Sequence, residues 1–328
     1  MNPFLFSSVE GNGQCLDGGA MFGNAPRVLW SRWQNPDSEG RIQLSCRSLL
    51  IEIGEIKILC ETGIGAFFEP KLAERYGVQN KDSHELLKNL STLGMTEEDI
   101  DYVILSHLHF DHAGGLLPAY SEIKKGNTDL CFPKALYIVG KQAFDRACQP
   151  HLRDRASFIP GLTDKLKQSG RLIIVETNKP SGILENHLHP SGFEFSDRFS
   201  SLPREEQIRR MPILDRFGLS FIFTDGHTPG QMHTIFQNEK GQKIFFAGDL
   251  IPGRAWVHLP ITMGYDRWPE KLIEEKQAIY QKAEEENWLI FFTHDKETAC
   301  ARIRKNQKGH YESYNEHSFL QRNNLHAL

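Results

Sequence analysis

The sequence contains no apolar run long enough to cross a bilayer. A membrane-spanning helix needs about 20 consecutive apolar residues, and the longest runs here, such as Leu49-Leu50-Ile51 and Ile244-Phe245-Phe246-Ala247, are far shorter. The first residues also lack the basic region and the apolar stretch of a secretory signal. We therefore predict a cytoplasmic protein with no membrane partner.

Cysteine is scarce and follows no pattern. The six cysteines are scattered without Cys-x-x-Cys spacing: Cys15, Cys46, Cys60, Cys131, Cys148 and Cys300. This distribution is typical of reduced thiols in the cytoplasm, and it argues against both a disulfide framework and a four-cysteine zinc site.

Basic charge is not in excess either. The 38 Lys and Arg residues are outnumbered by 42 Asp and Glu residues, which gives a net charge of −4. Because a nucleic-acid surface needs a basic footprint, we expect no nucleic-acid partner and instead a small-molecule substrate; composition indicates no oligomeric state. With 39% hydrophobic residues, the 328-residue chain can bury a large core. We predict a single domain over 1–328 with its core at about 42–300.

Apolar runs and helical patterns alternate through this core. We predict two strands within 42–61, joined by a turn at Gly54-Glu55, and further strands at 102–105, 135–139, 172–175, 219–224, 232–237, 243–247 and 289–292. Helical patterns lie at 69–76, 83–93, 141–148 and 269–286. The glycine-rich first forty residues are expected to form loops, the segment 178–212 a long insertion or lid, and the polar tail after Cys300 a surface segment.

A dense group of ligand-type side chains follows the strand at 102–105. His107, His109, Asp111 and His112 stand in the pattern His-x-His-x-Asp-His, directly after Tyr102-Val103-Ile104-Leu105. Imidazole nitrogen and carboxylate oxygen are ligands that Zn²⁺ takes at roughly 2.0–2.2 Å. No packing role explains four such side chains at this spacing, so we interpret them as metal ligands.

Three later strands also end in a histidine or an aspartate. His227 lies on a glycine turn after 219–224, Asp249 follows 243–247, and His294 follows 289–292. Side chains at the ends of neighbouring strands can converge on one point. Five histidines and two aspartates at one edge predict a two-metal site. His187 and His189 repeat the His-x-His spacing, but no strand precedes them, so they are not included.

Together these motifs resemble those of the metallo-β-lactamase superfamily, in particular its lactonase and phosphotriesterase-like branch. The resemblance covers roughly 45–295 and implies an α/β fold, an αββα sandwich of two mixed β-sheets flanked by helices. It assigns His107, His109 and His227 to a first metal and Asp111, His112 and His294 to a second, with Asp249 bridging. Where the family has an Asp-Thr-Gly turn that supports the site, this chain has Glu61-Thr62-Gly63.

The resemblance also narrows the range of expected substrates. The main zinc β-lactamases place a cysteine at the position of Asp249, which disfavours antibiotic hydrolysis. Quorum-signal lactonases place a tyrosine three residues after the bridging aspartate, where this chain has Pro252. Tyr265 or His258 is a candidate to supply the missing polar group. Met21 and Phe22 are candidates for an apolar lip over the substrate.

The ligand set indicates the chemistry. Two divalent ions sharing a water can lower its pKa toward neutrality and give a hydroxide that attacks an ester carbonyl. Asp111 is then the candidate catalytic residue that relays a proton. His233 supports a ligand or packs in the core, and the sequence leaves both possibilities open. We predict that the loops 13–23, 178–212 and 254–266 border the substrate cleft.

Zinc is the first expectation for both ions, although the same ligands suit iron and manganese. The predicted function is hydrolysis of a lactone or another carboxylic ester. A thioesterase or phosphotriesterase would use the same site. An iron-dependent oxidoreductase and a non-catalytic metal-binding relative are the alternatives from other classes.

Overall fold

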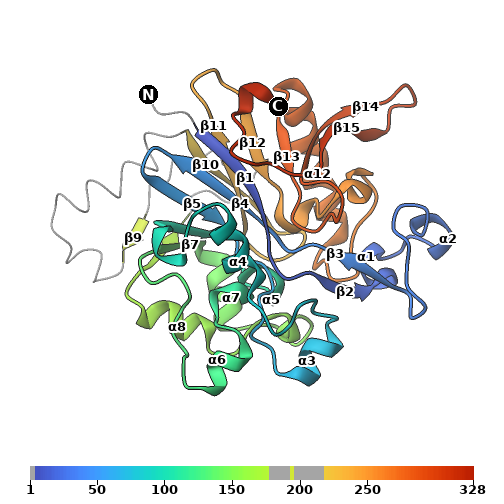
Figure 1. Cartoon of the computed structure of the whole chain (residues 1–328). Coiled ribbons are helices and arrows are strands. Elements are labelled where there is room, and N and C mark those ends of the chain that lie inside the picture. Colours follow the sequence, from blue (N-terminus) through green and yellow to red (C-terminus); the bar gives the residue numbers. More distant parts are fainter. Residues whose placement is uncertain (1–3, 177–192, 196–217) are drawn as a thin grey trace.

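The computed structural model describes residues 4–176, 193–195 and 218–328. Two large sheets lie face to face with helices on their outer sides (Figure 1), which confirms the predicted αββα sandwich. Apart from residues 193–195, the predicted insertion 178–212 lies outside the described residues, as do His187 and His189.

The first sheet has seven strands and is mixed. Their order is β1 (Phe4–Glu10), β4 (Arg47–Ile53), β5 (Ile56–Cys60), β6 (Tyr102–Leu105), β7 (Leu136–Gly140), β8 (Leu172–Val175) and β9 (Phe193–Phe195). Strands β5 to β8 pair in parallel, and the outer pairings are antiparallel. The central strands are buried on both faces, which explains why their sequences are continuous apolar runs.

The second sheet has six strands. Their order is β10 (Leu219–Thr224), β11 (Gln231–Gln237), β12 (Lys243–Phe246), β13 (Leu289–Phe291), β14 (Cys300–Lys305) and β15 (Tyr311–His317). Only the β12–β13 pairing is parallel among these. The sheet is therefore mixed, like the first.

Three apolar layers hold the sandwich together. The largest lies between the sheets, where residues such as Ile104 and Ile138 pack with Phe221 and Phe246. On the outer face of the first sheet, α4 (Glu85–Thr92), α7 (Lys141–Cys148) and α8 (Leu162–Gln168) bury a second layer. On the outer face of the second sheet, α12 (Pro269–Glu285) buries a third. The proline at the first turn of α12 is favourable there, because that position needs no amide donor.

Shorter elements surround one edge of the sandwich. A hairpin-like pair, β2 (Gln14–Asp17) and β3 (Arg41–Leu44), forms a separate two-stranded sheet. The other α-helices of the described residues are short: α1 (Gly18–Phe22), α2 (Arg27–Trp30), α3 (Pro70–Arg75), α5 (Phe110–Ala113) and α6 (Tyr120–Lys124).

Two expectations about the ends of the core are wrong, and one is correct in part. The first forty residues are not only loops, since they include β1, β2, α1 and α2. The predicted pair of strands with a turn at Gly54-Glu55 is β4 and β5, but the segment 42–61 also contains part of β3, which pairs with β2. The tail after Cys300 forms β14 and β15 of the second sheet. Its outer strand β15 is mostly half-exposed, so its sequence lacks the apolar pattern by which a strand is recognised.

The two ends of the chain meet at the edge of the first sheet. The Phe6 amide donates to the Asn323 carbonyl at 2.9 Å, and the Ser8 amide donates to the Leu320 carbonyl at 3.0 Å. The core is thus larger than the predicted 42–300. Within the described residues, no helix has both the length and the apolar character needed to cross a membrane. All six cysteines lie in the described part of the chain and are free.

Candidate metal centre

The ends of four strands deliver the predicted ligands to one edge of the sandwich. From the first sheet, β6 leads into the loop and short helix α5 that carry His107, His109, Asp111 and His112. From the second sheet, β10 leads to His227, β12 to Asp249 and β13 to His294. All seven side chains are buried or nearly so. The site therefore lies where the two sheets meet.

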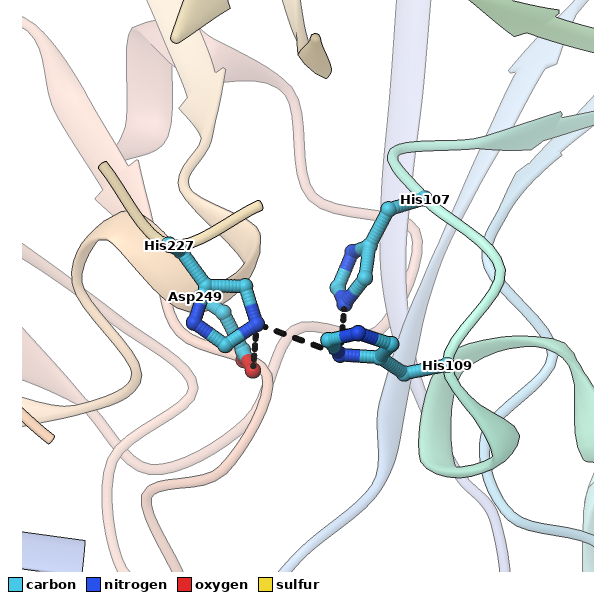
Figure 2. Close-up of side chains that lie close together, drawn as sticks. All are labelled: His107, His109, His227 and Asp249. Carbon is cyan, nitrogen blue, oxygen red and sulfur yellow. Dashed lines mark hydrogen bonds and ion pairs between the residues drawn. The ribbon is translucent and has the colours of Figure 1, made fainter. Parts of the chain in front are cut away.

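A first cluster consists of His107, His109, His227 and Asp249 (Figure 2). The Nδ1 atom of His109 lies 2.9 Å from Nε2 of His107 and 3.2 Å from Nε2 of His227. The same His227 nitrogen lies 3.2 Å from Oδ2 of Asp249. Ligands around a tetrahedral zinc ion are separated by roughly 3.3 Å. The spacing of these four side chains thus fits one ion.

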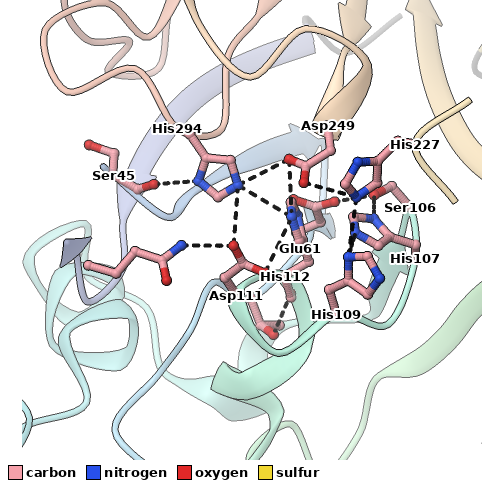
Figure 3. Close-up of polar contacts among 12 residues, drawn as sticks. Ser45, Glu61, Ser106, His107, His109, Asp111, His112, His227, Asp249 and His294 are labelled. Carbon is pink, nitrogen blue, oxygen red and sulfur yellow. Dashed lines mark hydrogen bonds and ion pairs between the residues drawn. The ribbon is translucent and has the colours of Figure 1, made fainter. Parts of the chain in front are cut away.

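A second cluster consists of Asp111, His112 and His294. The Nε2 atoms of the two histidines are 3.3 Å apart. They lie 3.7 Å and 3.6 Å, respectively, from the carboxylate oxygens of Asp111 (Figure 3).

Asp249 connects the two clusters. Its Oδ2 faces the first cluster, while Oδ1 lies 3.2 Å from Nε2 of His112 and 3.1 Å from Nε2 of His294. Oδ1 is buried and has no partner in hydrogen-bond geometry among the residues that the structure describes. A buried carboxylate oxygen without a hydrogen bond is costly unless an ion coordinates it. The donor set therefore fits two metal ions that share Asp249.

Four of the histidines are fixed through their second ring nitrogen. His227 Nδ1 lies 2.8 Å from Asp266, His112 Nδ1 lies 2.8 Å from Glu61, and His294 Nδ1 donates to the Ser45 carbonyl at 2.7 Å. His107 Nδ1 lies 2.9 Å from the Ser106 hydroxyl. Such contacts orient each ring and leave Nε2 available for a metal.

Glu61 lies beneath both clusters. Its carboxylate accepts from the Ser106 hydroxyl, which contacts His107 of the first cluster, and it also contacts His112, a ligand of the second cluster. The residue is fully buried, and its φ of +63° is left-handed, a conformation that costs free energy for a non-glycine residue. This strained turn places the longer glutamate side chain where the family pattern has aspartate.

Sequence reasoning missed three of the supporting groups. Asp266 lies in the loop 254–266 that was assigned only to the cleft. Gln14 donates to Asp111 at 2.8 Å from β2, far away in the sequence. The Ser45 carbonyl carries no side-chain signal that a sequence pattern could reveal. The one signal in the sequence is that Asp266 is the single acidic residue of the mostly apolar segment 254–266.

The electrostatics of the clusters differ. Burial, reinforced by the neighbouring imidazoles, holds the pKa of His107 and His109 well below the usual value. Burial acts in the same direction on His112, but the carboxylates of Glu61, Asp249 and Asp111 outweigh it and raise the pKa of that ring well above the usual value. Burial opposes ionisation of Asp249 too, yet three facing histidines hold its pKa well below the usual range.

Two buried charges on α12 hold the loops around His227. Glu275 accepts from the backbone amides of Asp225 and Gly226 at 2.8 Å and 2.9 Å. The ammonium of Lys276 donates to three carbonyls of the loop leading to Asp266, those of His258, Leu259 and Ile261, at 3.0 Å, 3.2 Å and 2.9 Å. One helix thus fixes both the backbone before His227 and the loop that carries its partner carboxylate.

The loop of His294 is held by a buried arginine. Arg47 on β4 donates to the carbonyls of Phe292, Asp295 and Thr298 at 3.1 Å, 2.9 Å and 3.2 Å. Its guanidinium also pairs with Glu10. The second sheet's ligand loop is therefore anchored on the first sheet.

A cleft of about 130 Å³ opens over the clusters. Its walls are mostly apolar, and its floor exposes ligands of both clusters: it is lined by Leu16, Met21, Tyr76, His109, Phe110, Asp111, Ala156, Ser157, His227, Asp249, Tyr265 and His294. Met21 and Tyr265 thus lie where substrate contact was predicted. The loops 13–23 and 254–266 border the cleft; 178–212 cannot be placed beside it, being outside the described residues.

Two predicted substrate contacts are wrong. Phe22 is fully buried in an aromatic stack, 5.5 Å from the ring of Trp30 and 4.6 Å from that of Trp256. His258 stacks on Trp33 at 4.8 Å and lines a different cavity. Of the Met21-Phe22 pair, only Met21 lines the cleft, although both side chains belong to the same apolar cluster.

His233 lies in the middle of β11. Its Nε2 is 2.7 Å from the Thr224 hydroxyl and its ring packs on Phe245 at 5.3 Å. Burial lowers its pKa to about 3, so the ring is neutral. These contacts favour a packing role between strands.

Comparison with known proteins agrees with this architecture. Residues 41–124 match the family model described as the metallo-beta-lactamase superfamily. An N-acyl homoserine lactonase of Bacillus thuringiensis is 20% identical over 266 residues, which cover 76% of this chain and 82% of the lactonase.

Solved structures resemble the whole chain. A probable metal-dependent hydrolase from Staphylococcus aureus is 22% identical, covers 98% of both chains and has a TM-score of 0.73. AidC, a dizinc quorum-quenching lactonase in complex with a product, is 17% identical, with a TM-score of 0.63 over 96% of this chain and 95% of AidC. At these identities, the likeness shows a shared fold.

Proposed function

We propose that this chain, which carries a metallo-β-lactamase domain, is a metal-dependent hydrolase of carboxylic esters that acts preferentially on lactones. The observation that carries the proposal is Asp249, whose two oxygens face two separate ligand clusters at the floor of one cleft. The domain match and the fold shared with lactonases support it.

The two ions would be held by the first cluster and the second cluster, with Asp249 common to both. Zinc is the metal that this set of imidazoles and carboxylates suits first. When bound, such a pair supplies a water of near-neutral pKa and polarises the carbonyl oxygen of an ester.

The chain's own residues would handle the proton and the substrate. Asp111 lines the cleft, and Gln14 orients its carboxylate so that the other oxygen is free to accept a proton and pass it to the leaving oxygen. Burial and the charge of Asp111 raise the pKa of Tyr265 to about 12, so its hydroxyl remains protonated and can donate to a substrate oxygen. Tyr265 would thus replace the tyrosine that is absent at Pro252.

The cleft walls favour an apolar acyl group. Leu16, Met21, Tyr76 and Phe110 surround the opening above the ligands. An apolar wall with few polar groups at its base is typical of small-molecule sites. A lactone or ester fits this arrangement, since only its reacting group needs polar partners.

The experiment combines metal analysis with a substrate panel. Purified protein is expected to contain about two zinc ions per chain and to hydrolyse N-hexanoyl homoserine lactone or 4-nitrophenyl acetate faster than a thioester or a phosphotriester. Chelation should abolish turnover, and zinc should restore it. If the enzyme hydrolysed a thioester or a phosphotriester faster than the lactone and the carboxylic ester, the proposed substrate class would be wrong. If the protein held one tightly bound iron ion and hydrolysed none of these substrates, the proposed hydrolase activity would be refuted.

A further inference from the structure

Several guanidinium groups lie on the segments that flank one side of the cleft, although none of these arginines lines the cleft itself. Four arginines, Arg146, Arg153, Arg155 and Arg267, belong to two segments that meet beside the first cluster. We call them the arginine group. The nearest carboxylate of these segments, Asp154, is the only one within ion-pair distance of any of them in the described part of the chain.

The two segments form part of the cleft wall. Ala156 and Ser157 line the cleft directly after Arg155, and the ring of Phe158 lies 4.9 Å from that of His109. On the other segment, the Arg267 amide donates to the His227 carbonyl at 3.1 Å. Arg153 joins the segments by donating to the Gly264 carbonyl at 3.0 Å, next to Tyr265.

The single carboxylate does not neutralise this group. Asp154 Oδ2 accepts two bonds from Arg146, at 3.0 Å and 2.7 Å, and lies 4.0 Å from Nε of Arg267. The neighbouring Asp266 is already bound to His227 and to the Met263 amide. Arg153 and Arg155 make no ion pair with any described residue and are exposed.

Arg267 is the most unusual member. Its side chain is only 13% exposed, and its buried Nε and Nη1 atoms have no hydrogen-bond partner within the described residues. Unsatisfied buried donors on a charged group carry a large desolvation cost. Like charges from Arg146 and Arg153 add to this cost, and burial lowers the pKa of Arg267. A largely buried guanidinium with unsatisfied donors can be stabilised by binding an anion.

We propose that the arginine group forms an anion-binding subsite beside the cleft, so that the preferred ester or lactone carries a carboxylate away from its scissile bond. The inference rests on the proposed function for the position of the scissile bond. Arg267 supplies the buried donors, whereas Arg153 and Arg155 attract the anion to the mouth of the cleft. The chain as a whole has a net charge of −4, so this positive wall is a local feature.

The test compares two 4-nitrophenyl esters that differ only at the far end of the acyl chain: 4-nitrophenyl hydrogen adipate ends in a carboxylate, and 4-nitrophenyl methyl adipate ends in a neutral methyl ester. For the zinc-loaded enzyme, kcat/KM for the charged ester is expected to be about tenfold higher, and the ratio should fall with added salt because exposed charges are screened. Arg267→Gln and Arg153→Gln should each bring the ratio toward one. Arg32→Gln removes an exposed arginine outside the group and should keep the wild-type ratio.

A binding measurement makes the test independent of turnover. Calorimetry on the zinc-loaded enzyme should show adipate binding about tenfold more tightly than monomethyl adipate, with the difference lost in Arg267→Gln. If neither ester is hydrolysed but this difference holds, the proposed function fails and the subsite stands. If the wild-type enzyme had equal kcat/KM values for the charged and the neutral ester and equal affinities for adipate and monomethyl adipate, the proposed subsite would be refuted. Arg267 would then have only a structural role.

Discussion

The two halves of the metal centre, the first cluster and the second cluster, differ in the types of ligand that they contain. The first cluster contributes three imidazoles, two of which have strongly lowered pKa values, and Asp249 is its one carboxylate ligand. The second cluster has a further carboxylate ligand, Asp111. Each cluster also has one histidine that contacts a buried carboxylate, His227 with Asp266 and His112 with Glu61. The second half thus holds one carboxylate more than the first and is the more acidic of the two. We expect the first half to bind its ion mainly through the positions of its imidazole nitrogens, and the second half to depend more on the negative charge of its carboxylates.

The largest expected effect comes from removing the group that the halves share. Asp249→Ala deletes both facing oxygens, so metal content should fall from about two ions per chain to one or fewer, and turnover should be lost. Elemental analysis of the purified variant, together with lactone or ester assays, measures both quantities. Two ions retained in the variant would mean that the halves are independent and that Asp249 does not bridge them.

The variant Asp111→Asn tests whether the second cluster can lose its metal ion while the first cluster keeps its own. The amide keeps the shape but removes the negative charge from the second cluster and the acceptor for the leaving group's proton. Turnover is expected to fall roughly 10²–10⁴-fold, the usual contribution of a general acid–base group. Metal analysis should show one ion retained, because His107, His109 and His227 are unchanged. A near wild-type rate would show that the catalytic role is assigned to the wrong residue.

A matched pair of supporting variants tests whether charge matters more in the acidic half. Asp266→Asn and Glu61→Gln each replace a carboxylate that contacts a ligand's second ring nitrogen. Each should weaken zinc affinity about 10–100-fold. Because Glu61 also accepts from Ser106, the Glu61 variant should be the weaker binder. Competition with a chromophoric chelator gives both affinities; the reverse order would contradict the proposed contrast.

The smallest effect concerns the helix that supports the first half. Burial raises the pKa of Glu275 to about 7, above the unfolded value of about 4.3. The folded protein therefore binds more protons between these values, and the free energy of unfolding should fall as pH rises from about 5 to 7, by at most roughly 1.4 kcal/mol per pH unit.

Denaturant unfolding of metal-free protein at several pH values measures that dependence. Glu275→Gln should flatten the profile in this pH range. Glu274→Gln changes an exposed neighbour on the same helix and should leave the slope as it is. If Glu275→Gln and wild type have the same slope, the two amides of Asp225 and Gly226 keep the carboxylate ionised throughout.

The sequence was sufficient to predict those strands and ligands that are recognised from a short stretch of neighbouring residues. The runs at β6, β12 and β13 are apolar because both faces are buried, and the ligands follow each run within a few residues. Such a pattern can be recognised without the fold. Met21 and Tyr265, which the sequence analysis named as candidate substrate contacts, both line the cleft.

What the sequence could not predict depends on contacts between distant segments. Gln14 reaches Asp111 across 97 positions, and Ser45 reaches His294 across 249. Phe22 and His258 were misplaced because a loop's direction is set by its packing, here the aromatic stack around Trp256 and the carbonyls held by Lys276. The strand β15 was missed since an edge strand with one half-exposed face has little apolar periodicity.

The anchoring of the His294 loop on Arg47 has a consequence for biosynthesis. Arg47 leaves the ribosome early, but the three carbonyls it holds belong to Phe292, Asp295 and Thr298, more than 240 positions later. The segment around residue 320 that closes on β1 is made later still. Pairings this distant in sequence form slowly. The His-x-His-x-Asp-His motif therefore lacks its full set of partners until the segments that carry Asp249 and His294 have been translated, and metal binding is expected only after that point.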